Sequence, residues 1–424
     1  MKRNAGVGLF ELDTRTFLAF LTACAICCLC CLPCNAQSGK DGPVGAAEED
    51  FKEVDPYTKG DVELQRRAGY VSLRPFAWGE GIQGQEVIEV LGGVDLLWAE
   101  TAHFKICSSL KSYKRKPDSQ ENLRVEKELE QLARRMPGFK LPKGGKLDPW
   151  LRLHLYAQRL EQLYTEFCER TGFSDADFAN TALVPGQGSG PYLGQKLKPT
   201  VLLAEKSSAL GRFNRRYLKV DEEKSYRYVL PGGSMYLGIS AEAMRENGYE
   251  LDTALYCALA AGVVANMLDG LRDSYWATPL WFDLGLGHWF SRRIDERFTY
   301  YASGTMRYLD DDLHEWQPRV RGLVDNKFPY SWRDMLGSLE WSQFNAQNHM
   351  LIWSRVDWLL QLKAGKMRAF LEPLSVPLPQ GTKAEIAAIQ LQRATAALQA
   401  GFGMTPEACE AAWSAWVLKT YARK

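Results

Sequence analysis

The chain lacks an excess of charge of either sign. Lysine and arginine total 52 against 51 aspartates and glutamates, and no long run of one sign follows the first residues. Because proteins that bind nucleic acid usually present a strongly basic surface, this balance implies no nucleic-acid partner. Hydrophobic residues make up 46% of the 424 residues, enough to bury one large core or two moderate ones. We therefore expect a globular protein.

Cysteine is scarce beyond the first 36 residues. Six of the ten cysteines lie within that segment, and the other four, Cys107, Cys168, Cys257 and Cys409, contain no Cys-x-x-Cys pair. Their wide spacing argues against a zinc knuckle or a redox pair. Buried thiols are the default interpretation. One or two disulfides remain an alternative in an oxidising compartment, with no pairing assigned by the sequence.

The first 36 residues have the pattern of a signal peptide. Lys2, Arg3 and Arg15 precede an apolar stretch from Phe17 to Leu32, which is followed by small and polar residues around Ala36. The stretch has about 16 residues, fewer than the roughly 20 that a helix needs to cross a bilayer. We therefore expect cleavage after Ala36, an exported protein in the periplasm or outside the cell, and no transmembrane anchor after cleavage.

A second interpretation of the leader is a lipoprotein signal. Leu21-Thr22-Ala23-Cys24 resembles a bacterial lipobox, so anchoring at Cys24 stays an alternative, although the apolar segment before it would be very short. Residues 37–60 contain few apolar positions and are expected to form a flexible lead-in, because such a segment cannot supply a core.

Residues 61–250 are expected to form an N-terminal α+β region. Short apolar clusters between Gln85 and Lys111 suit strands joined by Gly92-Gly93, and Thr200 to Ala204 is typical of a buried strand. Helical spacing of apolar residues predicts helices over about 121–136 and 149–170. Two further strands are expected at about 226–230 and 235–239.

Residues 251–424 are expected to be mostly helical. Asp252 is a plausible N-cap for a helix that reaches about Leu271, and Pro279 suits the start of a helix that ends near Ile294. Further helices are expected at about 331–336, 348–362, 366–371, 383–400 and 406–420. Strands that precede helices along the chain favour the α+β class.

The second of these helices carries the most informative motif. Its sequence is Pro279-Leu-Trp-Phe-Asp-Leu-Gly-Leu-Gly-His-Trp-Phe290. It resembles the gluzincin metallopeptidase motif Pro-x-Trp-Phe-x-Glu-Gly-Leu-Ala-x-Tyr. Leu284 occupies the glutamate position of that motif. The resemblance implies a zincin-like fold, in which an N-terminal mixed sheet with helices is followed by a mostly helical region.

The resemblance also implies which positions would bind a metal. In gluzincins the glutamate is the third zinc ligand and lies 19 positions after the second histidine of an HExxH helix. The same spacing from Leu284 reaches Ala265, with Ala261 at the first histidine and Gly262 at the catalytic glutamate. Two ligands at i and i+4 share one helix face and need donor atoms. Because these side chains have none, we expect no catalytic zinc and no other cofactor.

Other segments between residues 85 and 420 resemble segments that occur in the same order in the peptidase MA-like family of exported bacterial proteins. They include His103-Phe104-Lys105-Ile106, Ser331-Trp332-Arg333-Asp334 and the segment from Gly403 to Trp416. In active relatives a tyrosine on a later helix is expected to stabilise the transition state. Near that position this chain has Met350, Leu351 and Trp353, a further departure. The alternative is a packed pair of helices with a coincidental Trp-Phe motif.

A former active-site cleft would have few polar groups. His288 is the only histidine expected beside it, and a catalytic zinc site takes about three protein ligands, so a structural or ligand-contact role is favoured. Trp281, Asp283, His288 and Arg292 are the expected cleft contacts, since binding sites combine apolar walls with a few polar anchors. A peptide or a glycan would suit such walls.

The sequence thus predicts an exported, catalytically inactive metallopeptidase-like protein whose former cleft is a binding surface or is filled by side chains. Two alternatives belong to other classes. One is a hydrolase with unrecognised catalytic residues, built from scattered aspartates and glutamates. The other is a cell-envelope structural or assembly protein that makes its contacts through the helical C-terminal region.

Overall fold

The computed structural model describes residues 54–116, 119–137, 139, 143–178, 198–230, 234–246, 250–271, 278–300, 306–308, 314–362, 364–374 and 378–423. The expected signal peptide, Cys24 and residues 37–53 of the expected lead-in lie outside these ranges. The described residues belong to one compact unit, Lys52–Lys424. Within residues 54–60, Asp55 and Thr58 are buried, whereas residues 54, 56, 59 and 60 are exposed. The packed chain therefore begins earlier than residue 61.

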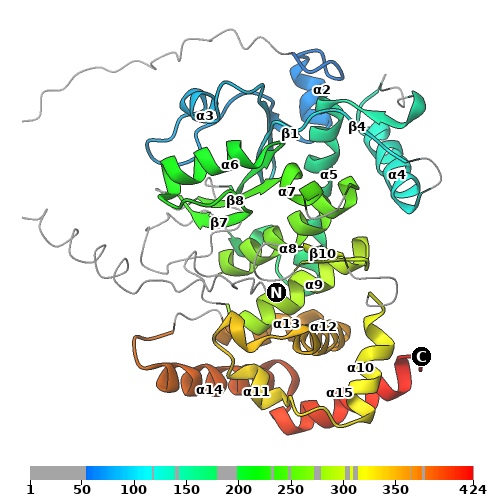
Figure 1. Ribbon diagram of the computed structural model, residues 1–424, viewed down its shortest axis with the longest axis vertical. Helices are drawn as coiled ribbons and strands as arrows, with labels where there is room; N and C mark the ends of the chain where they lie inside the picture. Colours follow the sequence, from blue (N-terminus) through cyan, green and yellow to red (C-terminus); the bar gives the residue numbers. More distant parts are fainter. Residues whose placement is uncertain are drawn as a thin grey trace, which may run out of the picture. The chain divides into compact units, whose positions relative to one another are not determined.

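A six-stranded mixed sheet with the order β1-β2-β3-β6-β8-β7 forms the first half of the unit (Figure 1). Neighbours β3, β6 and β8 are parallel, whereas β1, β2 and the edge strand β7 are antiparallel to their neighbours. Every residue of β6 and β8 is buried, as expected for central strands covered on both faces. The strands are β1 (Tyr70–Ser72), β2 (Leu97–Thr101), β3 (Lys105–Ser108), β6 (Thr200–Ala204), β7 (Tyr226–Val229) and β8 (Met235–Ser240).

Helices pack on this sheet and dominate the described residues after 250, which confirms the α+β class. Those of the first half are α2 (Val62–Arg67), α3 (Gly84–Val90), α4 (Gln120–Arg135), α5 (Pro149–Thr171), α6 (Ser207–Phe213) and α7 (Ala241–Glu246). Those of the second half are α8 (Asp252–Gly270), α9 (Leu280–Ile294), α10 (Trp316–Asp325), α11 (Trp332–Leu336), α12 (Ala346–Gln361), α13 (Ala364–Leu374), α14 (Lys383–Phe402) and α15 (Pro406–Thr420). Two small ribbons pair β4 (Tyr113–Lys114) with β5 (Lys146–Leu147) and β9 (Phe298–Tyr300) with β10 (Met306–Tyr308).

Helix α5 illustrates how local sequence sets an element. The side chain of Asp148 accepts a hydrogen bond from the backbone N–H of Leu151, and Pro149 occupies the first turn, where its missing N–H costs nothing. Gly172 ends the helix in the left-handed conformation at φ 78°. The predicted helix over 149–170 is confirmed within one residue at its end.

Two details of the predicted elements are wrong. The apolar cluster around Val87 forms helix α3 and no strand, because Val87 and Leu91 are spaced by one helical turn and are both buried. Asp252 is the first residue of α8, and Leu251 occupies the cap position. The carboxylate of Asp252 is unavailable for capping because two arginines bind it.

The sheet and the helices share one hydrophobic core that extends from Ala68 to Tyr421. Helix α8 lies at its centre, and all of its residues are buried. It is the one helix among the described residues that is long and apolar enough to cross a membrane. Contacts with the sheet strand β8 and with α5, α7 and α9 account for its apolar composition.

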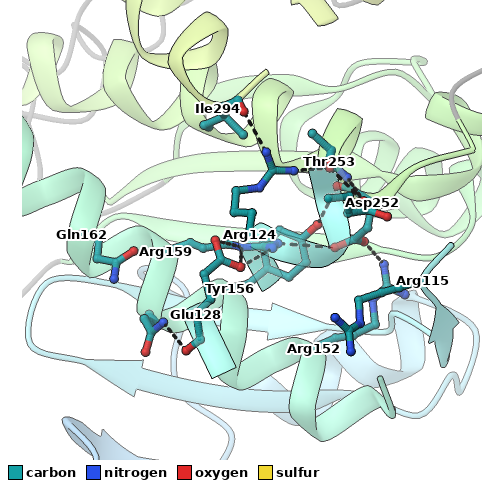
Figure 2. Close-up of polar contacts among 12 residues, drawn as sticks. Arg115, Arg124, Glu128, Arg152, Tyr156, Arg159, Gln162, Asp252, Thr253 and Ile294 are labelled. Atoms are coloured by element: carbon teal, nitrogen blue, oxygen red, sulfur yellow. Dashed lines mark hydrogen bonds and ion pairs between the residues drawn. The ribbon is translucent and has the colours of Figure 1, made fainter. Parts of the chain in front are cut away.

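A buried network of charges holds the start of α8 (Figure 2). The carboxylate of Asp252 accepts from the guanidinium groups of Arg152 and Arg159, and Arg159 also donates to Glu128 at 2.7 Å. Burial alone would raise the pKa of Asp252, but these two cations outweigh burial and hold it below its ordinary value. Because Glu128 lies on α4 and both arginines lie on α5, the network fixes three helices against each other.

We predict that Asp252→Ala destabilises the protein by about 3–5 kcal/mol, because it removes the main carboxylate partner of the buried Arg152 and the second partner of the buried Arg159. Urea unfolding followed by circular dichroism measures this loss. Glu250→Ala is the matched control, since Glu250 pairs with Lys116 at an exposed site where the side chains are 73% and 63% accessible. That variant should lose less than about 1 kcal/mol. Equal losses in the two variants would contradict the assigned role of the network.

Candidate functional site

Helices α8 and α9 pack as a close antiparallel pair. The thiol of Cys257 donates to the carbonyl oxygen of Ser291 at 3.4 Å. One helical turn further along α8, a Cβ atom placed on Gly287 would lie 3.6 Å from the Cβ of Ala261. If the two helices keep this register for one more turn, Ala265 lies level with Leu284. The helix pair therefore brings the positions that the resemblance assigns to the metal ligands to neighbouring levels of one interface.

The positions of the degenerate motif are filled by hydrocarbon packing. Ala261, Ala265 and Leu284 are only 5%, 4% and 6% exposed. Gly262, at the position of the catalytic glutamate, faces the sheet, and a Cβ there would approach Leu237 of β8 to 2.9 Å. A longer side chain at residue 262 would collide with the sheet, because interiors of this density leave no spare volume.

A third helix, α12, closes the other side of α9. A Cβ on Gly285 would lie 2.5 Å from Val356 and 2.8 Å from Ile352, so only glycine permits this approach. Met350 and Trp353, which stand near the expected position of the catalytic tyrosine, are buried on α12. Within the described ranges, no group of three or more histidine, cysteine, aspartate or glutamate side chains is placed to hold a metal ion.

A polar cluster lies at the end of the helix pair next to the edge strand. Arg227 of β7 donates to Asp269, in the last turn of α8, at 2.5 Å, and to Asp283, in the first turn of α9, at 3.4 Å. All three side chains are at least 86% buried, with 13%, 8% and 14% of their surface exposed. The arginine therefore joins the edge strand to both helices.

Burial raises the pKa of Asp269 to about 7, because the neighbouring charge of Asp283 adds to burial and outweighs the attraction of Arg227. Burial raises the pKa of Asp283 as well, against the opposing effect of Arg227. A negative charge is unfavourable at the C-terminal end of α8, where Asp269 lies, and favourable at the N-terminal end of α9, where Asp283 lies. Burial makes both carboxyl groups hold a proton more strongly than an exposed aspartate does.

His288 has a second histidine beside it, which the sequence did not indicate. Its Nε2 lies 2.8 Å from Nδ1 of His349 on α12, so one imidazole donates to the other. Burial lowers the pKa of His288 well below its usual value and that of His349 to about 4. Both rings are therefore neutral at physiological pH. Arg292 stacks on Trp316 at 3.9 Å, and His288 meets the same ring edge-on.

The four expected cleft contacts do not line one cavity. Asp283 belongs to the cluster with Arg227, whereas His288 and Arg292 share Trp316. Trp281 is fully buried against Phe370 of α13. Cavities of about 380 and 510 Å³ lie beside α10 and α12 and between α4 and α5, and no residue of the degenerate motif lines either. Arg227, Asp269 and His349 had no signal in the sequence, because each is defined by partners that are distant in the chain.

Cys107, Cys168, Cys257 and Cys409 are all free thiols in the structure. Burial raises the pKa of Cys168 to about 11 and that of Cys107 well above its ordinary value. A thiol with a raised pKa is a weak nucleophile, because the thiolate is the reactive form. These residues supply no activated nucleophile to the site.

We predict that Asp269→Asn removes a pH-dependent loss of stability. The pKa of Asp269 is about 7 in the folded chain and is expected to be about 3.9 when unfolded. Its contribution is therefore fully present below about pH 4 and is lost as the pH rises through 7. Between about pH 5 and pH 8 the wild type should lose about 2–3 kcal/mol of unfolding free energy relative to Asp269→Asn. Asp95→Asn, at an exposed aspartate, is the control, and parallel curves for Asp269→Asn and wild type would contradict the assignment.

No family model, no curated protein and no solved structure matches the chain. The interpretation of the site therefore depends on its residues and their contacts.

Proposed function

We propose that the chain is an exported, catalytically inactive relative of the zincin-like metallopeptidases. The observation that carries the proposal is the register of α8 against α9, which sets Ala265 level with Leu284 and Ala261 one turn away, beside Gly287. A zinc triad from two helices requires this arrangement of its ligand positions. The mixed sheet followed by helices agrees with the fold that the motif implies.

The residues at the former ligand positions make this part of the interface apolar and closed. A catalytic zinc needs an open coordination position for water or substrate. Here methyl and isobutyl groups occupy the ligand positions, and glycines at 285 and 287 let the neighbouring helices approach. The polar rim that remains is Arg227 with Asp269 and Asp283.

The proposal predicts that zinc binding returns when the ligands are restored. The triple variant Ala261→His, Ala265→His, Leu284→Glu should bind about one zinc per chain, because the three donors would meet across the helix pair. Elemental analysis after dialysis measures the metal, and the melting temperature should rise with zinc and fall with a chelator. The wild type should retain no stoichiometric zinc under the same conditions.

A control with the same composition separates geometry from added histidines. Leu259→His, Val263→His, Leu284→Glu moves each histidine by two positions, about 200° around the helix, away from the glutamate. This control should bind zinc far more weakly than the triple variant. If circular dichroism shows that both variants fold and they bind zinc equally, the helix pair is no former metal site. Stoichiometric zinc held by the wild-type helix pair would overturn the inactive assignment itself.

A second candidate function is acid–base hydrolysis by Asp269 and Asp283. Two mostly buried carboxyl groups with raised pKa values beside one arginine are a pattern found at catalytic sites. The same pattern arises in structural clusters, and neither residue lines the cavity beside α10 and α12 or the cavity between α4 and α5. The first proposal is therefore favoured.

A hydrolytic screen distinguishes the two functions. Wild type, Asp269→Asn and Asp283→Asn are compared on peptide and glycoside substrates. We expect no turnover that either substitution removes. Turnover by the wild type that falls by about 10²-fold or more in both variants would instead establish acid–base catalysis by this pair.

A further inference from the structure

A separate polar cluster surrounds His103 in the turn between β2 and β3. Nδ1 of His103 lies 2.6 Å from the carboxylate of Glu161 on α5, and Nε2 lies 3.4 Å from the carboxylate of Asp175. Asp175 opens the short helix η2 (Asp175–Phe178), which follows α5. The ring of Tyr164 stacks on the imidazole at 3.6 Å, and its hydroxyl donates to Asp175 at 2.6 Å.

This geometry fits a charged imidazole. A neutral imidazole has one N–H and one lone pair, so it can donate to only one of two carboxylates. The other carboxylate would then face a lone pair. With both nitrogens protonated, each ring nitrogen donates to one carboxylate, and the single positive charge lies between two negative ones. The arrangement of His103 therefore distinguishes the two protonation states.

The two contacts of His103 differ in strength. Glu161 is 25% exposed and accepts a second hydrogen bond from the backbone N–H of His103 at 3.1 Å. Asp175 is 69% exposed and its contact is longer. Loss of the imidazole charge therefore weakens the Asp175 contact first, because Glu161 keeps its backbone donor.

We propose that His103 is a pH-dependent latch, whose charged form fastens the turn Asp175–Phe178 to the β2–β3 turn and whose neutral form releases it. After release, Asp175 still accepts the hydrogen bond from the Tyr164 hydroxyl. Asp177, in the same turn, keeps its ion pair with Arg368 of α13 at 2.8 Å. The released turn is therefore loosened on the His103 side and stays attached to α13.

The surrounding groups set the pH range of the latch. Burial lowers the pKa of His103, but Glu161 and Asp175 outweigh it and raise the pKa above its ordinary value. The groups that face the cluster are Glu161 and Tyr164 of α5, with Cys168 behind Tyr164, and Asp175 of η2. The latch is thus fully formed below about pH 6.5, the ordinary pKa of histidine, and opens as the pH rises through the raised value. Histidine is suited to this range.

Hydrogen–deuterium exchange of residues 174–178 tests the proposal on the intact chain. After correction for the intrinsic exchange rate, protection in the wild type should fall by about fivefold between about pH 6 and pH 8.5, as expected for the loss of one hydrogen bond. His103→Gln should show the lower protection at both pH values, because its amide cannot carry the charge. Equal protection of the wild type at the two pH values would overturn the latch.

Two further measurements make the test specific. Asp177→Asn loosens the same turn by weakening the Arg368 contact but leaves His103 in place, so its protection should be lower at both pH values and should still fall with pH. The NMR titration of the His103 ring, assigned by its absence in His103→Gln, should have a midpoint above about 6.5. A midpoint at or below that value, or a pH response that persists in His103→Gln, would reject the proposal even if exchange is pH-dependent.

Discussion

The close approach of α8 and α9 is the constraint on which the site depends. It requires small residues where the helices face each other, and Ala261 and Gly287 supply them. On the far side of α9, Gly285 performs the same role for α12, whose Ile352 and Val356 leave no room for a Cβ. Three helices are thus locked through glycine and alanine. The packing is tightest at Gly285, where it leaves no room for any side chain.

Charges inside the unit are balanced in two different ways. At the start of α8, the carboxylates of Asp252 and Glu128 face two guanidinium groups, so every ion there has an opposite partner. At the end of α8, Asp269 and Asp283 share Arg227. The first arrangement holds the pKa of Asp252 down, whereas the second leaves the pKa of Asp269 near 7. The N-terminal end of α8 is therefore fixed at all physiological pH values, and its C-terminal end responds to pH.

The sequence predicted those features that depend on neighbouring residues. The buried strand β6 has five apolar or small residues in succession, and α5 carries its own start and stop signals, so both were found. Helix α3 was mistaken for a strand because its short apolar cluster fits both periods. The partners His288 with His349 and Arg227 with Asp269 could not be found. Each pair joins segments whose approach is set by the packing of whole helices, and polar residues carry no periodic signal that reveals it.

Two clusters far apart in the sequence follow one electrostatic rule. Each sets two carboxylates around one cation: Asp269 and Asp283 around Arg227, and Glu161 and Asp175 around His103. The difference lies in which member can change its charge. Arginine stays charged at any physiological pH, so at the Arg227 cluster only a carboxyl can change its protonation state. At the other cluster the histidine is the member that titrates near neutrality. Both clusters therefore favour the protonated state. A rise in pH lowers the stability of the folded chain at the first cluster, because a buried carboxyl becomes charged beside Asp283, and weakens the attachment of the turn after α5 at the second.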